Sequence, residues 1–392
     1  MFSRRLFLKN SAIAMFGMGS VPAWLSRAVY AEGAPGQRKK ILIAIFQRGA
    51  VDGLNVVVPH GERAYYASRP TIAIPHPDGT EQGAIDLNGH FGLHPSLKAL
   101  KPLWDRQELA IVEAVGSPDP SRSHFDAQDY MESGTPGLKS TSDGWLNRAM
   151  QPEAQSSPVR AISLSPALPR TLRGKNEALT IANLNDFQVK DAALSATFES
   201  MYGTAGREAF DAIRIVQSIP QSGAPYPKGR LGQSLRQIAR VIKADVGLEV
   251  AFTDTGGWDT HVNESGQLAN LLRDFGDALA AFSNDMGDRM ADITVVTMSE
   301  FGRTVKENGN QGTDHGHANV MFVFGGSVRG GRIYGEWPGL EREQLYEGRD
   351  LNVTTDFRAV LSELVTKQMG NPAITTVFPG FKNQPHAGLL KT

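Results

Sequence analysis

Histidine and carboxylate side chains gather in four short polar segments of this chain of 392 residues. Four of its nine histidines lie in these segments. The segments contain Asp52; Ser121, Ser123 and His124; Asp259 and His261; and Glu300, Arg303, Asp314, His315 and His317. Because imidazole and carboxylate groups bind divalent cations and transfer protons, these residues are candidates for one shared metal or acid–base site.

Cysteine is absent from the sequence. Its absence excludes disulfide bonds, thiolate metal sites and cysteine nucleophiles. The remaining oxygen and imidazole ligands suit zinc, manganese, calcium or magnesium. A divalent metal ion of that group is therefore the expected cofactor.

Each polar segment follows an apolar run that is predicted to be a buried strand. These runs are Lys39–Phe46, Leu109–Val115, Leu248–Phe252 and Ile293–Met298. Segments with helical apolar spacing alternate with them, including Leu231–Ala244, Ser265–Met286 and Asp356–Met369. This alternation predicts an α/β fold with a mostly parallel sheet and helices on both faces. Ligands bind at the carboxyl edge of such a sheet, which is where the polar segments begin.

Two of the segments have simpler interpretations as well. Asp52-Gly53 is a common turn sequence. Ser121 or Ser123 is a suitable cap for a helix that begins near His124. A serine at a helix N-terminus is also where a phosphate or sulfate group is bound or attacked, so both interpretations stay open.

The first residues resemble an export signal. Ser3-Arg4-Arg5-Leu6-Phe7-Leu8-Lys9 matches a twin-arginine motif, a short apolar segment follows, and small residues predict cleavage after Ala31. A membrane anchor is the alternative, but Gly17, Gly19 and Pro22 interrupt the apolar run. We expect residues 1–31 to be a signal peptide that engages the twin-arginine translocase, with a periplasmic or secreted mature protein and no stable membrane span.

The remaining chain is long enough for one large domain and is acidic. The formal net charge is −1, and residues 1–31 hold four basic residues and no acidic one, so the rest carries −5. This charge argues against nucleic acid as a partner. Residues 32–392 are predicted to form a single α/β domain with insertions.

Five motifs together resemble a family of twin-arginine-exported bacterial proteins, the domain-of-unknown-function 1501 family. They are Arg48-Gly49-Ala50-Val51-Asp52-Gly53-Leu54-Asn55, Arg122-Ser123-His124-Phe125-Asp126-Ala127-Gln128, Gly257-Trp258-Asp259-Thr260-His261, Ser299-Glu300-Phe301-Gly302-Arg303 and Asp314-His315-Gly316-His317. The resemblance implies a fold like that of alkaline phosphatases and sulfatases. Two features depart from that superfamily: Pro118 stands where sulfatases have a modified cysteine, and Glu300-Phe301 stands where an Asp-His pair is usual.

Together, the residues and the resemblance predict an exported metal-dependent hydrolase of phosphate or sulfate esters, with an anionic ester as substrate. The expected metal ligands are Asp52, Asp259, His261, Glu300, Asp314, His315 and His317. The expected catalytic residues are Ser123 or Ser121 as nucleophile, His124 in proton transfer and Arg303 as an anion clamp. The alternative is a non-catalytic member of the fold that serves as a periplasmic or extracellular binding or assembly protein.

Overall fold

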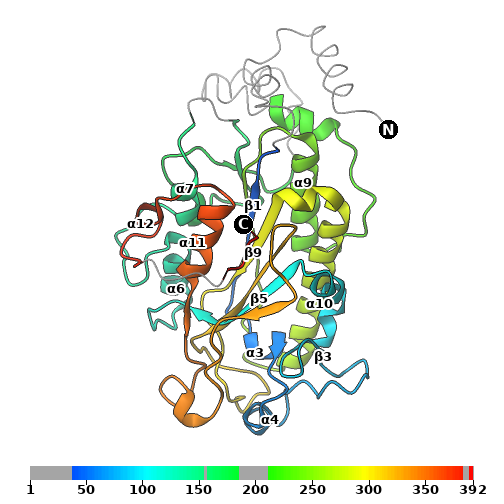
Figure 1. Cartoon of the computed structure of the whole chain (residues 1–392), viewed down its shortest axis with the longest axis vertical. Coiled ribbons are helices and arrows are strands. Elements are labelled where there is room, and N and C mark those ends of the chain that lie inside the picture. The colour runs from blue at the N-terminus through cyan, green and yellow to red at the C-terminus, as the bar shows by residue number, and fades with distance from the viewer. Residues whose placement is uncertain (1–37, 154–156, 185–210, 383–387, 392) are drawn as a thin grey trace.

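The computed structural model describes residues 38–153, 157–184, 211–382 and 388–391, and the predicted signal peptide lies outside them. A central sheet has helices on both faces (Figure 1). Its strands are β1 Ile41–Gln47, β5 Leu109–Gly116, β6 Ala161–Ser163, β7 Leu179–Thr180, β8 Val250–Thr255, β9 Ile293–Met298, β10 Asn319–Gly325, β11 Arg332–Tyr334 and β12 Thr355–Asp356. Within the described ranges, no helix is both long and apolar enough to cross a membrane.

The strands follow the order β11-β5-β10-β9-β1-β8-β6-β7, and β12 pairs with β5. All neighbouring pairs are parallel except those of β10, which runs antiparallel to both β5 and β9. The predicted mostly parallel α/β fold is therefore confirmed. Because only β10 is reversed, the carboxyl ends of β1, β5, β8 and β9 lie at the same edge as the start of β10.

Both faces of β1 are buried, which explains its continuous apolar sequence. Ile41, Ile43 and Ile45 pack into one core cluster, together with residues of α9 Arg230–Ala244 and α10 Glu264–Met286. Leu42 and Phe46 point to the other face. There they pack with residues of α6 His124–Ser133, α7 Trp145–Ala149, α11 Phe357–Lys367 and α12 Ile374–Val377. The alternation of side chains along the strand thus builds two cores, one on each face.

Smaller elements surround the carboxyl edge and the ends of the main helices. Short helices are α3 Gly53–Val56, α4 Arg63–Ser68 and α5 Lys101–Asp105, and 3-10 helices are η1 Pro95–Leu100, η2 Arg170–Leu172, η3 Gly287–Asp292 and η4 Arg342–Gln344. A second, antiparallel sheet joins β2 Val57–Val58, β4 Gly92–Leu93 and β3 Ile85–Asp86. It lies with α3 and α4 at the lower end of the molecule in Figure 1.

Glu113 in the middle of β5 makes a pH-dependent contribution to stability. Its side chain is 2% exposed, and Oε1 has no hydrogen-bond partner among the described residues. Burial raises the pKa of Glu113 well above its ordinary value of 4.5, although the backbone N–H of Ala114 offsets part of this. The folded state therefore keeps a proton that the unfolded chain releases, and stability is lost as the pH rises above 4.5 towards the folded pKa.

We predict that Glu113→Gln removes this loss. The wild-type free energy of unfolding should fall, relative to that of the variant, by up to about 1.4 kcal/mol per pH unit above the unfolded pKa. Urea unfolding at pH 5, 7 and 9 measures the difference. Glu343→Gln, at an exposed position of η4, is the control and should follow the wild type. Parallel curves for wild type and Glu113→Gln would contradict the prediction.

Candidate metal centre

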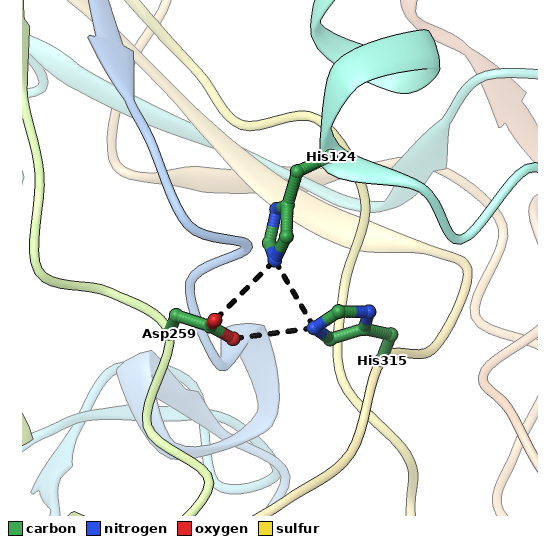
Figure 2. A group of neighbouring side chains, drawn as sticks. All are labelled: His124, Asp259 and His315. Carbon is green, nitrogen blue, oxygen red and sulfur yellow. Dashed lines mark hydrogen bonds and ion pairs between the residues drawn. The ribbon is translucent and has the colours of Figure 1, made fainter.

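Three side chains from different parts of the chain meet at the carboxyl edge of the sheet. Figure 2 shows that His124 comes from the start of α6, Asp259 from the loop after β8, and His315 from the loop before β10. These three residues, the triad, have ligand atoms that all lie within 4.8 Å of one another. His124 Nε2 is 3.1 Å from His315 Nε2 and 3.5 Å from Asp259 Oδ2, and His315 Nε2 is 3.2 Å from Asp259 Oδ1.

His261 adds a fourth donor. Its Nε2 lies 3.0 Å from His315 Nε2 and 3.0 Å from Asp259 Oδ1. His261 and Asp259 belong to one sequence motif. In the structure, the His261 side chain lies next to Asp259 and His315 of the triad. The sequence-predicted residues His124, Asp259, His261 and His315 are therefore brought together.

All three imidazoles are held by their other ring nitrogen. Nδ1 lies next to an oxygen that can only accept a hydrogen bond, so we assign the proton of each neutral ring to Nδ1. The pairs are His124 with Glu300 Oε1 at 2.8 Å, His315 with the Arg122 carbonyl at 2.9 Å, and His261 with Asp314 Oδ1 at 3.2 Å. This leaves the Nε2 lone pairs of neutral rings pointing at one another and at a carboxylate.

Such an arrangement fits a cation. Unprotonated nitrogens that lie 3.0 Å apart repel each other unless a proton or a metal ion lies between them. Ligand atoms of a tetrahedral site with bonds of 2.0–2.1 Å are roughly 3.3 Å apart. The separations within the triad, from 3.1 to 3.5 Å, agree with that spacing. Histidines whose Nδ1–H is bound by a carboxylate or a carbonyl are also the usual form of metal ligands.

Glu300 lies behind His124 instead of among the converging atoms. It is 1% exposed, and Oε1 accepts hydrogen bonds from His124, Gln128 and the backbone of Gly49, each at 2.8 Å. Although burial opposes its ionisation, these donors hold the pKa of Glu300 below its usual range. The hydrogen bond from His124 to Glu300 in turn raises the pKa of His124. Glu300 thus orients the imidazole and increases its basicity.

Arg303 holds Asp259 in place. Its guanidinium is buried, with Nη2 2.5 Å from Asp259 Oδ1. Its other N–H groups donate to the carbonyls of Gly49, Ala50, Trp258 and Thr313, and Nη1 also lies 3.5 Å from His261 Nε2. Burial opposes ionisation of Asp259, but Arg303 outweighs it and lowers the pKa of this carboxyl. Because these partners use its N–H groups, Arg303 is not free to act as the anion clamp that the sequence suggested.

The glycines of two motifs explain how His315 comes close to Arg303. The segments around them pair as an antiparallel bridge, Arg303 with His315. A Cβ at Gly302 would lie 1.8 Å from the Ala318 carbonyl oxygen, and one at Gly316 would lie 2.3 Å from the Arg303 carbonyl carbon. Only glycine permits both contacts, so the single loop between β9 and β10 folds back on itself at these residues.

Asp52, a candidate ligand in the sequence, faces a different partner. Its two oxygens bind Nη1 and Nη2 of Arg69 at 2.5 and 2.9 Å, and both side chains are buried. Burial opposes ionisation of Asp52, but the charge of Arg69 lowers the pKa of this carboxyl. The structure thus places Asp52 in a buried ion pair, apart from the converging atoms of the triad.

Three further predicted residues lie beside the triad. His317 turns Nε2 toward the Ser117 carbonyl at 3.1 Å and packs against Tyr346. Ser123 is the exposed N-cap residue of α6, and its hydroxyl makes no capping bond. The Ser121 hydroxyl accepts the backbone N–H of Ser123 at 3.3 Å. Ser123 is therefore the serine whose hydroxyl is free next to His124.

Glu264, the first residue of α10, supports the site although its sequence context did not suggest it. Its Oε2 accepts hydrogen bonds from the hydroxyls of Thr260 and Thr313, at 3.1 and 2.8 Å. These threonines directly precede His261 and Asp314, so one buried carboxyl ties together the loops that carry them. Burial raises the pKa of Glu264 well above its usual value. The only sequence signal was an acidic residue at a helix start, which is typical of exposed first turns.

A cleft of about 630 Å³ adjoins the centre through Asp314. Its lining includes four basic residues: Arg63, Lys306, Arg342 and Arg349. Arg349 donates to the His315 carbonyl at 2.8 Å, whereas the structure gives the charged groups of the other three no carboxylate partner among the described residues. The cleft therefore holds four basic and three acidic residues, Glu307, Asp314 and Glu341, beside the triad.

Comparisons with solved structures find similarity at low sequence identity. The zinc complex of the C-terminal periplasmic domain of EcEptC from Escherichia coli is 10% identical, with 75% of each chain covered and a TM-score of 0.36. The PsFucS1 sulfatase from Pseudoalteromonas sp. is 13% identical over 80% of this chain and 68% of that one, with a TM-score of 0.33. Alkaline phosphatase from the Antarctic bacterium TAB5 is 12% identical over 74% and 92%, with a TM-score of 0.32. Among curated proteins, none matches in sequence.

A family model described as protein of unknown function, DUF1501, matches residues 39–372. The chain belongs to this family, as its sequence motifs predicted.

We predict that Glu300→Gln weakens metal binding without unfolding the protein. Glutamine keeps the size of the side chain but lacks the charge that orients His124, and loss of such a partner lowers metal affinity by about 10–100-fold. Competition with a chromophoric chelator measures the affinity. Glu81→Gln, in an exposed loop, is the control. An unchanged affinity in Glu300→Gln would contradict the role assigned to this residue.

We also predict that Asp52→Asn destabilises the fold and leaves the metal content of folded protein unchanged. The substitution leaves Arg69 buried without its counter-charge, which costs about 3–5 kcal/mol. Chemical unfolding and metal analysis of the same samples separate the two effects. The double variant Asp52→Asn/Arg69→Met, which removes both charges, should recover most of the stability. Loss of metal from folded Asp52→Asn would instead make Asp52 a ligand.

Proposed function

We propose that this protein is an exported, metal-dependent hydrolase of phosphate or sulfate esters. The observation that carries the proposal is the convergence of His124, His261, His315 and Asp259, with every imidazole Nδ1 held by an acceptor. A site built only to stabilise the fold would not need unprotonated nitrogens to face one another. The exposed Asp259, with 45% of its side chain accessible, leaves the centre open to a substrate.

Zinc or manganese suits the donor set better than calcium or magnesium, which prefer oxygen ligands. The triad and His261 would hold the ion. When bound, it would supply positive charge that polarises the ester and lowers the pKa of an attacking hydroxyl.

Ser123 is the nucleophile that the geometry favours. Its hydroxyl is exposed at the N-terminus of α6, adjacent to His124, and free backbone amides there stabilise negative charge. Attack by Ser123 Oγ forms a bond to phosphorus or sulfur while the ester oxygen leaves as an alcohol, taking up the hydroxyl proton. Water then releases the anion and restores the serine.

The neighbouring cleft supports an anionic substrate. Its basic residues Arg63, Lys306 and Arg342 raise the local concentration of anions. Three acidic residues also line the cleft: Glu307 accepts hydrogen bonds from Thr71 and Ile72, Asp314 from Asn308 and His261, and Glu341 from the backbone of Gln344. The free basic groups are thus available to a ligand.

The second candidate is a non-catalytic binding or assembly protein in the same exported location. The observation in its favour is the state of the two arginines nearest the triad. Arg303 is saturated by carbonyls and Asp259, and Arg122 is paired with Asp350 and Glu347. Neither guanidinium is free to clamp a transferred phosphoryl or sulfuryl group.

Metal content and turnover of untagged protein test the proposal. We expect about one metal ion per chain and metal-dependent release of nitrophenol from the phosphate or sulfate ester of p-nitrophenol. Ser123→Ala should lower kcat on the order of a thousandfold or more with the metal retained. Ser121→Ala is the matched control and should keep most of the activity. Bound metal without turnover of either ester would support the binding protein instead.

A further inference from the structure

We infer that Asp350 is a positioning residue for the triad. It holds the side chain of Arg122, whose backbone carbonyl accepts the Nδ1 proton of His315 and which lies two residues before His124. Asp350 lies outside the five sequence motifs. The inference rests on the proposed function, because it explains how two of the proposed metal ligands are kept in place.

The segment that leads into α6 is shaped by local hydrogen bonds. The backbone N–H groups of Asp119, Ser121 and Ser123 each donate to a side chain two residues earlier, at 3.1, 2.9 and 3.3 Å. Such short-range bonds set the shape of the segment but do not place it against the rest of the chain. The position of the Arg122 carbonyl relative to His315 therefore depends on contacts with distant residues.

The Arg122 side chain makes such a contact. Its Nε and Nη2 atoms both donate to Asp350 Oδ2, at 3.0 and 2.6 Å, across 228 positions of the sequence. Nη2 also donates to Glu347 Oε2 at 2.8 Å. The Asp350 side chain is 0% exposed, whereas that of Glu347 is 56% exposed. Because exposed ion pairs contribute little and buried ones fix geometry, Asp350 is the partner expected to hold the guanidinium in place.

The Asp350 carboxylate in turn depends on Arg122. Its Oδ1 has no hydrogen-bond partner among the described residues, and Arg349 Nη1 lies 3.6 Å from Oδ2. Arg122 thus provides both hydrogen bonds that the structure gives this buried carboxylate. Moving the guanidinium away would leave a charge unpaired in the interior, which is strongly unfavourable.

The backbone around Asp350 is bound to the loop between β9 and β10. The carbonyls of its two sequence neighbours accept the backbone N–H groups of Val305 and Ala318, at 3.2 and 3.1 Å. Val305 lies in the first part of that loop, and Ala318 directly precedes β10. Asp350 therefore has a fixed place relative to the loop that carries His315.

His315 is held from two directions as a result. The Arg122 carbonyl accepts its Nδ1 proton at 2.9 Å, and Arg349 Nη2 donates to its backbone carbonyl at 2.8 Å. Ligand histidines keep their orientation through a bond to the ring nitrogen that does not bind the metal. Asp350 acts on this bond through Arg122, so it is a positioning residue and not a ligand.

Metal affinity and histidine NMR of Asp350→Asn test the inference. Asparagine keeps the size of the side chain but lacks the charge that holds Arg122. We expect the zinc affinity of the full chain, measured by competition with a chromophoric chelator, to fall by about tenfold, the low end of the cost of losing a ligand's partner. In metal-free protein with isotope-labelled histidine, the Nδ1–H signal of His315, assigned with His315→Gln, should be lost through exchange with solvent.

Glu347→Gln is the matched control. It removes the exposed carboxylate from the same arginine and should keep the wild-type zinc affinity and the wild-type His315 signal. The double variant Arg122→Met/Asp350→Asn removes both charges of the buried pair. It should lose as much affinity as Asp350→Asn alone, because both changes break one interaction. It also keeps the test decisive if the single variant does not fold.

The outcomes separate this inference from the proposed function. A wild-type zinc affinity or a wild-type His315 signal in folded Asp350→Asn would overturn the positioning role and leave the proposed hydrolase standing. Equal losses in Glu347→Gln would also overturn it, because the effect would not depend on the buried carboxylate. Wild-type protein that binds no metal would contradict the proposed function instead, and the NMR of metal-free protein would then decide whether Asp350 positions His315.

Discussion

Three hydrogen bonds from imidazole Nδ1 atoms determine what this site can do. They run from His124 to Glu300, from His261 to Asp314 and from His315 to the Arg122 carbonyl. With the proton held on that side, Nε2 of each neutral ring can only accept a proton or bind a cation. If Nδ1 were free, the rings could change tautomer and bond to one another as ordinary surface histidines do. The anchors therefore leave the neighbouring Nε2 atoms as acceptors, which is the form in which a neutral imidazole can bind a cation.

The sheet makes this arrangement possible. The carboxyl ends of parallel strands all lie at one edge of the sheet, so α6 and the loop after β8 begin there. The reversed β10 starts at that edge as well. Gly302 and Gly316 then allow the two ends of the β9–β10 loop to come into contact. Residues that are 191 positions apart, His124 and His315, consequently come within 3.1 Å.

Sequence analysis predicted the strands and the residues that gather at their ends, because apolar periodicity and polar breaks are local signals. It did not predict which carboxylates would face a cation. Glu300 and Asp52 both follow buried strands, yet each carboxylate is engaged by a partner far along the chain or across a loop: Glu300 by His124, and Asp52 by Arg69. Arg69 lies in a proline-rich stretch that carries no periodic pattern, so nothing local linked it to Asp52. Ion pairing depends on tertiary contacts, and spacing along one sequence does not contain them.

The division of charge at the carboxyl edge explains how an open site can also be rigid. Toward the interior, Asp52, Arg69 and Glu264 form a buried network with Asn55 and Tyr65, and it reaches the loops of His261 and Asp314 through two threonine hydroxyls. Arg303 is fully buried and holds Asp259 in place through the ion pair between its Nη2 and Asp259 Oδ1. Toward solvent, the Asp259 carboxylate stays accessible, with 45% of its side chain exposed. Buried ion pairs are poor sources of net stability, but they fix geometry because any displacement leaves a charge unpaired. We therefore interpret the buried charges of this edge as the frame that holds His124, Asp259 and His315 at a spacing suited to a cation, with His261 beside them.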